Sequence, residues 1–381
     1  MYYQHDSQAN SNGHTESIHI EVKRRPETRL PQVDLDNPGF GVEFSDHMFS
    51  REYRDGEWKT PRIVPYGPIS MPPATCTLHY GQAVFEGLKA FSSRDGAVRI
   101  FRPEAHHKRF RSSCRRLCIP EPDYDTFISA LNALISLDKE WVPKQHGYAL
   151  YLRPFIYADD EYLAVQVADK YQFFIITSPV GAYYDEGFNP VSLTTAEKYV
   201  RAVKGGVGDT KTPGNYAASL RPALEAKEQG FTQVLWLDAF EHRYIEEVGT
   251  MNIFFLMDDV LVTPKLEGAI LPGVTRDSVL RIAEDWGVPT EQRKVTIDEV
   301  FGAAKSGRLQ EVFGTGTAAV ISPVGMIQHR DDQVSINGND IGPFAKKLFD
   351  EITGIQYGLK ADRFDWMHTV KAGEYIEQQV S

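Results

Sequence analysis

Cysteine is scarce in this sequence, with three residues (Cys76, Cys114 and Cys118) among 381. An odd number of cysteines cannot form a complete set of disulfides, so we expect a reducing compartment rather than a disulfide-stabilised secreted scaffold. Cys114 and Cys118 lie four residues apart on an expected helix, without a histidine nearby at the spacing of a zinc site. We therefore predict core thiols there and no metal site.

The sequence also lacks long apolar runs and an excess of basic residues. No apolar stretch approaches the roughly 18 residues from which a membrane-spanning helix is inferred. Asp and Glu (52) outnumber Lys and Arg (41), and the net charge of −11 disfavours nucleic acid or an anionic membrane as the main partner. The first Lys or Arg is Lys23, so the N-terminus has neither a signal-peptide nor a transit-peptide pattern. We expect a cytoplasmic protein.

The chain is long enough for two domains, and its hydrophobic content of 42% can supply a core for each. Both halves mix strand and helix patterns, and hairpins are more frequent than β-α-β units, which indicates an α/β (α+β) fold. The predicted division is a disordered polar arm (1–35), a small α/β domain (36–178), a linker (179–190) and a larger C-terminal domain (191–381).

Local patterns predict the elements around a site. A hairpin is expected with its turn at 54–57, and a second with its turn at 94–96. Asn215 and Thr275 are expected N-caps of helices, and Pro222 should kink or interrupt the first of these. Other helices are predicted after Pro103 and over 124–140, 297–305 and 343–355, and strands over 148–154, 171–178, 191–195 and 233–237.

The most informative stretch is 203–219, V-K-G-G-V-G-D-T-K-T-P-G-N-Y-A-A-S. Three glycines precede a single lysine, Lys211, and a Pro-Gly pair follows it. Glycines at this density indicate backbone that turns sharply or approaches a ligand closely. A flexible surface loop with a solvated lysine is the alternative.

A nucleotide-binding P-loop is a second interpretation of Lys211. Its pattern is G-x-x-x-x-G-K-[ST], but the residue before Lys211 is Thr210 instead of glycine. The preceding run, 194–203, is not a clean apolar strand either. Covalent attachment of a carbonyl cofactor to the lysine suits the loop better, provided that other residues can bind such a cofactor.

Three further features fit such a cofactor. The segment 273–275 begins an expected helix, whose free N–H groups and dipole bind phosphate. The expected turn 314–317 offers more N–H and hydroxyl donors. Glu246 and Glu247 lie on one strand and face opposite sides, so one can be buried while the other meets water. Each has an ordinary alternative, but together with the lysine they are what pyridoxal phosphate requires.

A family resemblance is carried by L-H-Y-G-Q-A-V-F-E-G-L-K-A-F (78–91), L-Y-L-R-P (150–154), G-G-V-G-D-T-K-T-P-G-N-Y (205–216), Q-V-L-W-L-D (233–238), E-V-G-T-M-N (247–252), L-P-G-V-T-R (271–276) and F-G-T-G-T-A (313–318). These segments, in this order, closely resemble the branched-chain amino-acid aminotransferases of fold type IV. The resemblance extends from about Gly39 to Tyr357. It implies pyridoxal 5'-phosphate, amino-group transfer between Leu, Ile or Val and 2-oxoglutarate, and a homodimer.

The resemblance also implies residue roles at the cofactor. Lys211 would hold the cofactor covalently and, once freed, carry the proton at the substrate Cα. Glu247 would keep the ring nitrogen protonated, and Tyr216 would hydrogen-bond the phenolic oxygen. Residues implied to hold the phosphate are Arg109, Val274, Thr275, Gly316 and Thr317. Arg109 belongs to a run of basic residues on the helix expected after Pro103, and such a run usually forms a solvated face. It lies beside the apolar stripe of that helix, however, where it could point inward at a buried anion.

On the substrate side, the residues implied to wall an apolar pocket are Phe40, Tyr80, Phe85, Tyr151 and Tyr183. Tyr80 and the backbone around Thr317 and Ala318 would take the α-carboxylate. Arg153 would bind the distal carboxylate of glutamate, giving one pocket an apolar and an acidic substrate, or it would be a structural ion-pair residue.

A D-amino-acid aminotransferase or an aminodeoxychorismate lyase would share Lys211 and Glu247, and a non-catalytic member of the fold would need neither. The L-H-Y and G-T-M-N segments favour the branched-chain enzyme. Mammalian members carry a redox-active C-x-x-C after the Gly-Thr turn, where this chain has Ala319 and Ser322. We therefore expect no thiol regulation of that kind.

Overall fold

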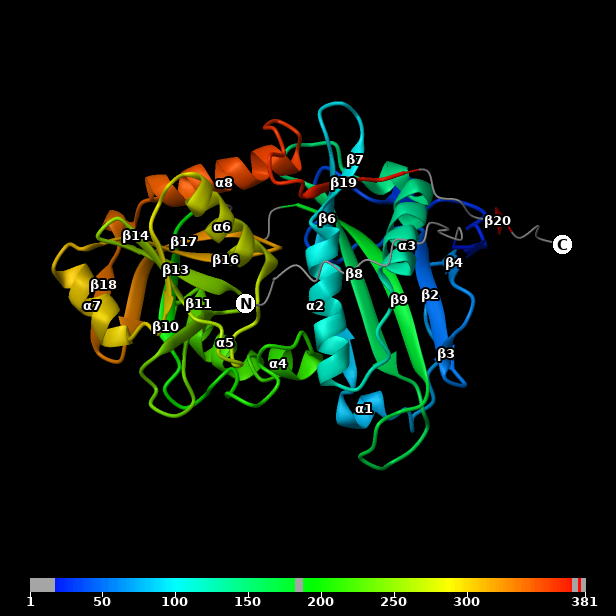
Figure 1. Ribbon diagram of the computed structural model, residues 1–381, viewed down its shortest axis with the longest axis horizontal. Helices are drawn as coiled ribbons and strands as arrows, with labels where there is room; N and C mark the ends of the chain where they lie inside the picture. Colours follow the sequence, from blue (N-terminus) through cyan, green and yellow to red (C-terminus); the bar gives the residue numbers. More distant parts are fainter. Residues whose placement is uncertain (1–17, 182–187, 372–375, 378–381) are drawn as a thin grey trace.

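Two β-sheets divide the molecule into two lobes that lie side by side (Figure 1). The computed structural model describes residues 18–181, 188–371 and 376–377. Tyr183, predicted to line the substrate pocket, lies outside the described residues. The two-lobed arrangement of mixed helices and sheets confirms the predicted fold class.

The first sheet joins eleven strands within the described ranges, in the order β19-β7-β6-β8-β9-β2-β4-β1-β20, with β3 on β2 and β5 on β8. Most pairs are antiparallel, as the hairpin-rich sequence predicts. Its strands are β1 (Glu21–Val22), β2 (His47–Arg54), β3 (Glu57–Trp58), β4 (Arg62–Pro65), β5 (Ala83–Phe85), β6 (Leu88–Ser92), β7 (Val98–Phe101), β8 (Ala149–Ala158), β9 (Tyr171–Val180), β19 (Met367–Thr369) and β20 (Ile376–Glu377).

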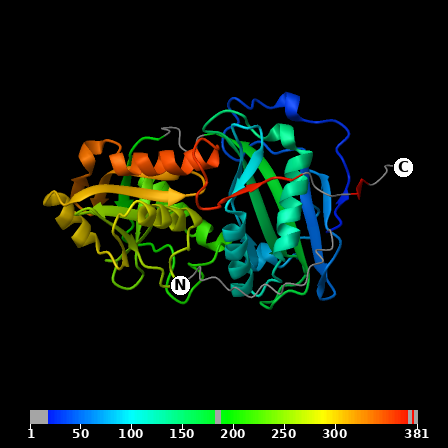
Figure 2. The same ribbon diagram turned by 45° about the horizontal axis from the view of Figure 1, so that its top comes forward.

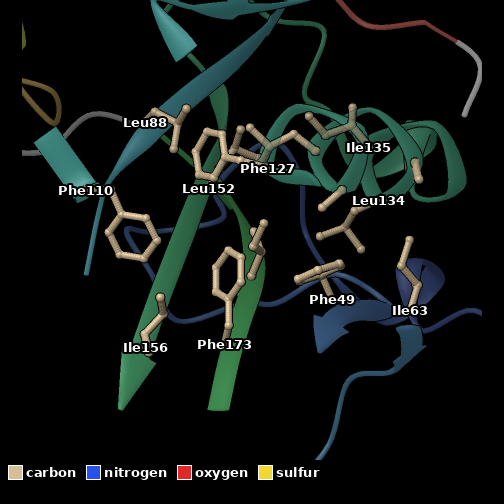
Figure 3. Close-up of a cluster of buried hydrophobic side chains, with 14 of the residues drawn as sticks. Phe49, Ile63, Leu88, Phe110, Phe127, Leu134, Ile135, Leu152, Ile156 and Phe173 are labelled. Carbon is tan, nitrogen blue, oxygen red and sulfur yellow. The ribbon is translucent and has the colours of Figure 1, made fainter. Parts of the chain in front are cut away.

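Helices α2 (Pro103–Arg116) and α3 (Tyr124–Leu137) pack beside this sheet (Figure 1). Figure 3 shows the core between sheet and helix, where Phe49, Phe110, Phe127 and Phe173 are fully buried. Burial of this apolar area is the main stabilising term of the lobe. The short elements of the lobe are η1 (Leu30–Gln32), α1 (Thr77–Tyr80) and η2 (Lys139–Trp141).

The second sheet joins nine strands among the described residues, in the order β12-β11-β10-β17-β16-β13-β14-β15, with β18 on β17. Its strands are β10 (Val191–Thr195), β11 (Gln233–Leu237), β12 (Ile245–Val248), β13 (Asn252–Met257), β14 (Val260–Pro264), β15 (Thr290–Arg293), β16 (Leu309–Gly316), β17 (Val320–His329) and β18 (Asp332–Ser335). The other elements of this lobe are α4 (Pro213–Ala217), α5 (Leu220–Glu228), α6 (Val274–Asp285), α7 (Ile297–Lys305), η3 (Asn337–Asn339) and α8 (Pro343–Gln356).

Segments near both ends of the chain pair with the first sheet, which differs from the predicted domain boundaries. The prediction of a disordered arm over 1–35 does not hold for residues 18–35, because Ile20 and Val22 are buried and β1 pairs with β4. The last strands also return to the first sheet, where β19 pairs with β7 and β20 with β1. Figure 2 shows the C-terminal segment crossing to that lobe. β19 and β20 therefore belong to the first lobe and not to the predicted C-terminal domain, and β9 continues to Val180, inside the predicted linker.

Two helix starts differ from the prediction. α4 begins at Pro213 with Thr212 as its N-cap, and Asn215 lies inside it. The helical run breaks at Ala218 and Ser219, and Pro222 lies in the first turn of α5, where the missing N–H costs no hydrogen bond.

The N-cap of α6 is Gly273, so Thr275 lies one residue inside the helix. The predicted turn at 314–317 also lies later, because β16 continues to Gly316 and β17 begins at Val320. Cys114 is buried as predicted, but Cys118 is exposed. Cys118 follows the end of α2 with a left-handed φ of 56°, outside the helical stripe from which its burial was inferred.

Candidate functional site

Lys211 lies where the two lobes meet. Its backbone N–H donates to Ser113 Oγ on α2 (3.0 Å), and its carbonyl accepts from the Phe85 N–H on β5 (3.0 Å). The Lys211 Nζ donates to Tyr216 Oη (2.6 Å) and lies 4.7 Å from the centre of the Phe85 ring. The lysine is therefore held by both lobes instead of being free on a surface loop.

The glycine-rich loop is held in place from within. Asn215 Nδ2 donates to the carbonyl oxygens of Val207 (2.7 Å) and Thr210 (2.8 Å), so α4 anchors the loop that precedes it. A Cβ at Gly208 would lie 2.4 Å from the Ala269 carbonyl oxygen, which excludes any side chain. These contacts explain the glycine and asparagine that flank the lysine.

Glu247 is buried on β12 and forms an ion pair with Arg201, whose Nε lies 2.8 Å from Oε2. Its other oxygen accepts from the Leu271 N–H (2.9 Å) and from Asn252 Nδ2 (3.2 Å). Burial raises the pKa of this carboxyl, and Arg201 opposes the rise. Glu247 and Tyr216 line one cavity, so Glu247 lies near the lysine that bonds Tyr216.

Arg109 on α2 points inward, as its place beside the apolar stripe predicts. It forms a two-point ion pair with Glu86, Nε to Oε1 at 2.7 Å and Nη2 to Oε2 at 2.9 Å, and Nη1 donates to the Pro272 carbonyl just before α6 (3.2 Å). Burial alone would raise the pKa of Glu86, but Arg109 and His106 hold it well below its usual range. The arginine is thus fixed beside the start of α6 by a fully buried carboxylate.

The start of α6 faces the β16–β17 turn across a second cavity. Residues of both lobes line that cavity, Lys89, His106, Thr275, Gly316 and Thr317 among them. A Cβ at Gly273 would lie 1.9 Å from Asn252 Oδ1, so the helix can begin this close to β13 only with glycine. The free N–H groups of such a helix start favour an anion.

The predicted substrate residues gather on the sheet face beside the lysine. Tyr151 and Arg153 lie on one face of β8, and Leu150 and Leu152 on the buried face, as the alternation predicts. Arg153 Nη2 donates to Tyr151 Oη (3.0 Å), and its guanidinium lies 4.9 Å from the centre of the Phe85 ring. The Phe40 ring packs against Tyr151 at 5.5 Å.

Tyr80 is placed differently from this group. It ends α1, is 41% exposed, and its ring lies 6.0 Å from that of its neighbour His79. Ala318 lies in the β16–β17 turn, where its carbonyl accepts from Lys89 Nζ (2.7 Å). The predicted residues that the structure describes therefore lie around these two cavities and on the β8 face beside Lys211, except for Tyr80, which is set apart at the surface.

The residues present fit pyridoxal phosphate by the chemistry of their donors. The lysine amine, the hydroxyl of Tyr216 and the buried carboxylate of Glu247 gather at one cavity. The helix start at Val274 and the hydroxyl-bearing turn supply anion donors at the other. In addition, Thr315 Oγ1 is buried without a hydrogen-bond partner among the described residues.

Four residues that support this site were not predicted from the sequence to do so. Glu86, Lys89, Arg201 and Asn215 each bond a predicted site residue or the loop around it. Glu86 and Lys89 carried a signal, because they are charged residues inside the otherwise apolar run 83–91. No sequence pattern pointed to Arg201, because a single arginine in a polar loop is common in any protein.

Glu246 is partly buried, and its Oε2 has no hydrogen-bond partner in the described part of the chain. Burial raises its pKa to about 7, with Arg201 opposing and Glu247 and Asp238 adding to the rise. The unfolded chain loses this proton near pH 4.5 and the folded chain near pH 7, so folding stability falls across that window as pH rises.

Glu246→Gln is therefore expected to stabilise the protein without cofactor by about 1–2 kcal/mol at pH 8, and by far less at pH 5. Urea unfolding at the two pH values measures this difference. Glu241→Gln, at an exposed glutamate four residues before β12, is the matched control and should change little. Equal stabilisation of Glu246→Gln at both pH values would contradict the argument.

Comparison with known proteins places the chain in a family. A family model described as amino-transferase class IV matches residues 83–327. Branched-chain-amino-acid aminotransferase 2 of Bacillus subtilis is 50% identical, over 94% of this chain and 98% of its own. A probable branched-chain-amino-acid aminotransferase of Staphylococcus aureus is 46% identical, over 91% of this chain and 97% of its own.

Solved structures agree with this placement. The branched-chain amino acid aminotransferase of Escherichia coli superposes with a TM-score of 0.71 at 25% identity, covering 86% of this chain and 99% of its own. The enzyme of Thermobaculum terrenum in its PLP form shares the fold, with a TM-score of 0.69 at 22% identity, covering 86% and 98%. Within the described ranges, no helix has the length and hydropathy to cross a membrane, and no cluster of three metal-ligating side chains occurs.

Proposed function

Since the chain belongs to the class IV aminotransferase family, we propose that it transfers the amino group between branched-chain L-amino acids and 2-oxoglutarate with pyridoxal phosphate. One observation carries the assignment of the site: Lys211 Nζ bonds Tyr216 Oη, beside a cavity that Tyr216 shares with the buried carboxylate of Glu247. The relatives named for this activity are similar over nearly their whole length.

Pyridoxal phosphate, when bound, supplies an electron sink for the pair left at Cα when its C–H bond breaks. Lys211 is the proposed base, whose amine would take the proton from the substrate Cα and hold it for return. Its Nζ lies 4.7 Å from the centre of the Phe85 ring and 5.0 Å from that of Tyr216, whose Oη accepts a hydrogen bond from it. The amine is therefore held in one place beside the cavity, as a positioned base requires.

Glu247 is the proposed partner of the cofactor ring nitrogen. Arg201 and the Leu271 N–H favour its ionised form, against the cost of burial. A buried anion at this place favours a protonated ring nitrogen. The phosphate is proposed to be held by Arg109, Thr275, Gly316 and Thr317. Glu86 fixes Arg109 in place, and the other three residues line the second cavity.

Arg153 is proposed to bind the distal carboxylate of glutamate and 2-oxoglutarate. Its guanidinium lies on the face that carries Tyr151 and Phe85, and it has no ion-pair partner among the described residues. An unneutralised arginine at an apolar wall suits a pocket that takes both an apolar and an acidic side chain.

Arg153→Met is expected to raise KM for 2-oxoglutarate at least about tenfold, because a charge-assisted bond contributes roughly 1.5–3 kcal/mol. KM for 4-methyl-2-oxopentanoate should change less than about threefold. Steady-state kinetics with both acids give the comparison, and Arg51→Met, at an arginine on β2 bonded to Thr126, is the control. Equal losses for both acids would argue for a structural role.

The activity itself is tested by a panel of 2-oxo acids with L-glutamate as donor. We expect the three branched-chain 2-oxo acids to be the best acceptors. A D-amino-acid aminotransferase, the alternative within the family, would accept D-glutamate, so the two enantiomers are assayed side by side. Preference for the D-donor would overturn the assignment.

A homodimer in the cytoplasm is also proposed, from the family resemblance and the reducing environment that three cysteines indicate. Light scattering should give about twice the 43.0 kDa chain mass, and a monomer active at the same rate would refute the dimer.

A further inference from the structure

A buried lysine, Lys89, joins the two lobes at the substrate end of the site. It lies on β6, and its Nζ donates to the carbonyl oxygen of Ala318 in the β16–β17 turn (2.7 Å). The two residues are 229 positions apart, so the bond connects the sheets of different lobes. The side chain is only 8% exposed.

The sheet register places Lys89 next to the proposed substrate pocket. Lys89 is paired with Tyr151 across β6 and β8, and directly paired residues point to the same face of a sheet. The lysine therefore lies between Tyr151 and the turn that carries Thr317 and Ala318. It also lines the cavity that contains Thr275 and Gly316.

The turn that Lys89 contacts is conformationally strained. Val320, the first residue of β17, has a φ of 63°, in the left-handed region that a β-branched side chain rarely adopts. Such a conformation is unfavourable for this residue type and persists only where the surroundings fix it. Gly316 pairs with Val320, so the three residues between them close a tight connection.

Charge and geometry suit Lys89 to hold this turn. Burial lowers the pKa of Lys89 to about 8, so the group is still mostly an ammonium at neutral pH and a strong donor. Because a peptide unit is planar and trans, fixing the Ala318 carbonyl toward Lys89 directs the N–H of Ala319 the opposite way. The bond thereby sets the orientation of the turn's backbone donors.

We propose that Lys89 is a positioning residue that holds the Thr317–Ala319 turn in the conformation that binds the substrate α-carboxylate. The proposal rests on the proposed aminotransferase function. It differs from a phosphate-binding role, in which Lys89 would act on the cofactor. All substrates share the α-carboxylate, so loss of Lys89 affects amino acid and 2-oxo acid alike.

The test replaces Lys89 with methionine, which keeps the length and removes the donor, and with arginine, which restores one. Lys89→Met is expected to raise KM for L-leucine and 2-oxoglutarate about tenfold or more, with kcat within about threefold and cofactor affinity unchanged. Lys89→Arg should recover most of the loss. Phe91→Leu, on the same face of β6, is the control for packing.

A binding measurement without turnover completes the test. Calorimetry on the holoenzyme compares 4-methylpentanoate with the matching amide, which lacks the carboxylate charge. Lys89→Met should weaken the acid and leave the amide unchanged.

If Lys89→Met leaves KM unchanged, or weakens cofactor binding instead of 4-methylpentanoate binding, the inference is overturned. If the unmodified enzyme transaminates none of the panel acids, the proposed function fails instead.

Discussion

Lys211→Ala is expected to abolish transamination, with kcat/KM reduced by at least about a thousandfold. A positioned general base contributes about 10²–10⁴ in rate, and this lysine is also the proposed point of cofactor attachment. The surroundings of Nζ support the role, since Tyr216 Oη lies at 2.6 Å and the Phe85 ring at 4.7 Å. The measurement is single-turnover transfer from L-leucine.

The matched control is Lys204→Ala, at an exposed lysine in the same glycine-rich loop. It should keep near-normal activity, because its side chain takes no part in the proposed chemistry. Absorbance gives a second readout: the unmodified protein should carry a yellow chromophore that borohydride bleaches irreversibly, and Lys211→Ala should resist this reduction. Retained turnover in Lys211→Ala would remove the mechanism.

Glu247→Gln is expected to lower kcat at least about a hundredfold while weakening cofactor binding much less. The amide keeps the size of the side chain and one acceptor oxygen but loses the negative charge proposed to keep the ring nitrogen protonated. The experiment measures kcat, the cofactor Kd and the free energy of unfolding together.

Stability is measured because Glu247 also neutralises Arg201, at 2.8 Å in the interior. Removing one partner of a buried ion pair typically costs about 3–5 kcal/mol. The double variant Arg201→Met with Glu247→Gln should recover much of this stability but none of the rate. If activity returns together with stability, the carboxylate is structural and its proposed electronic role is wrong.

The predicted elements followed local patterns that the structure largely confirms. Pro103 begins α2, 297–305 forms α7, and the strand that begins near residue 148 places Tyr151 and Arg153 on one face. Periodicity suffices there because each element buries one continuous apolar side. The helix starts at Asn215 and Thr275 were misplaced, since Thr212 and Gly273 hold the flanking conformation.

The site was predictable only in part. Residue types and segment order predicted site roles for Lys211, Glu247 and Arg109, but not the partners that hold the last two. Glu86 lies 23 positions from Arg109, and Arg201 lies 46 positions before Glu247, so no local pattern connects either pair.

By itself, the sequence determined the class of chain, the position of the lysine loop and the family resemblance, because composition and short motifs are local properties. The tertiary structure decided how the termini return to the first sheet and which carboxylate neutralises which arginine. It also decided that Lys89 contacts a turn 229 residues away. Such contacts depend on how two sheets pack against each other, and packing brings together residues that the chain order keeps apart.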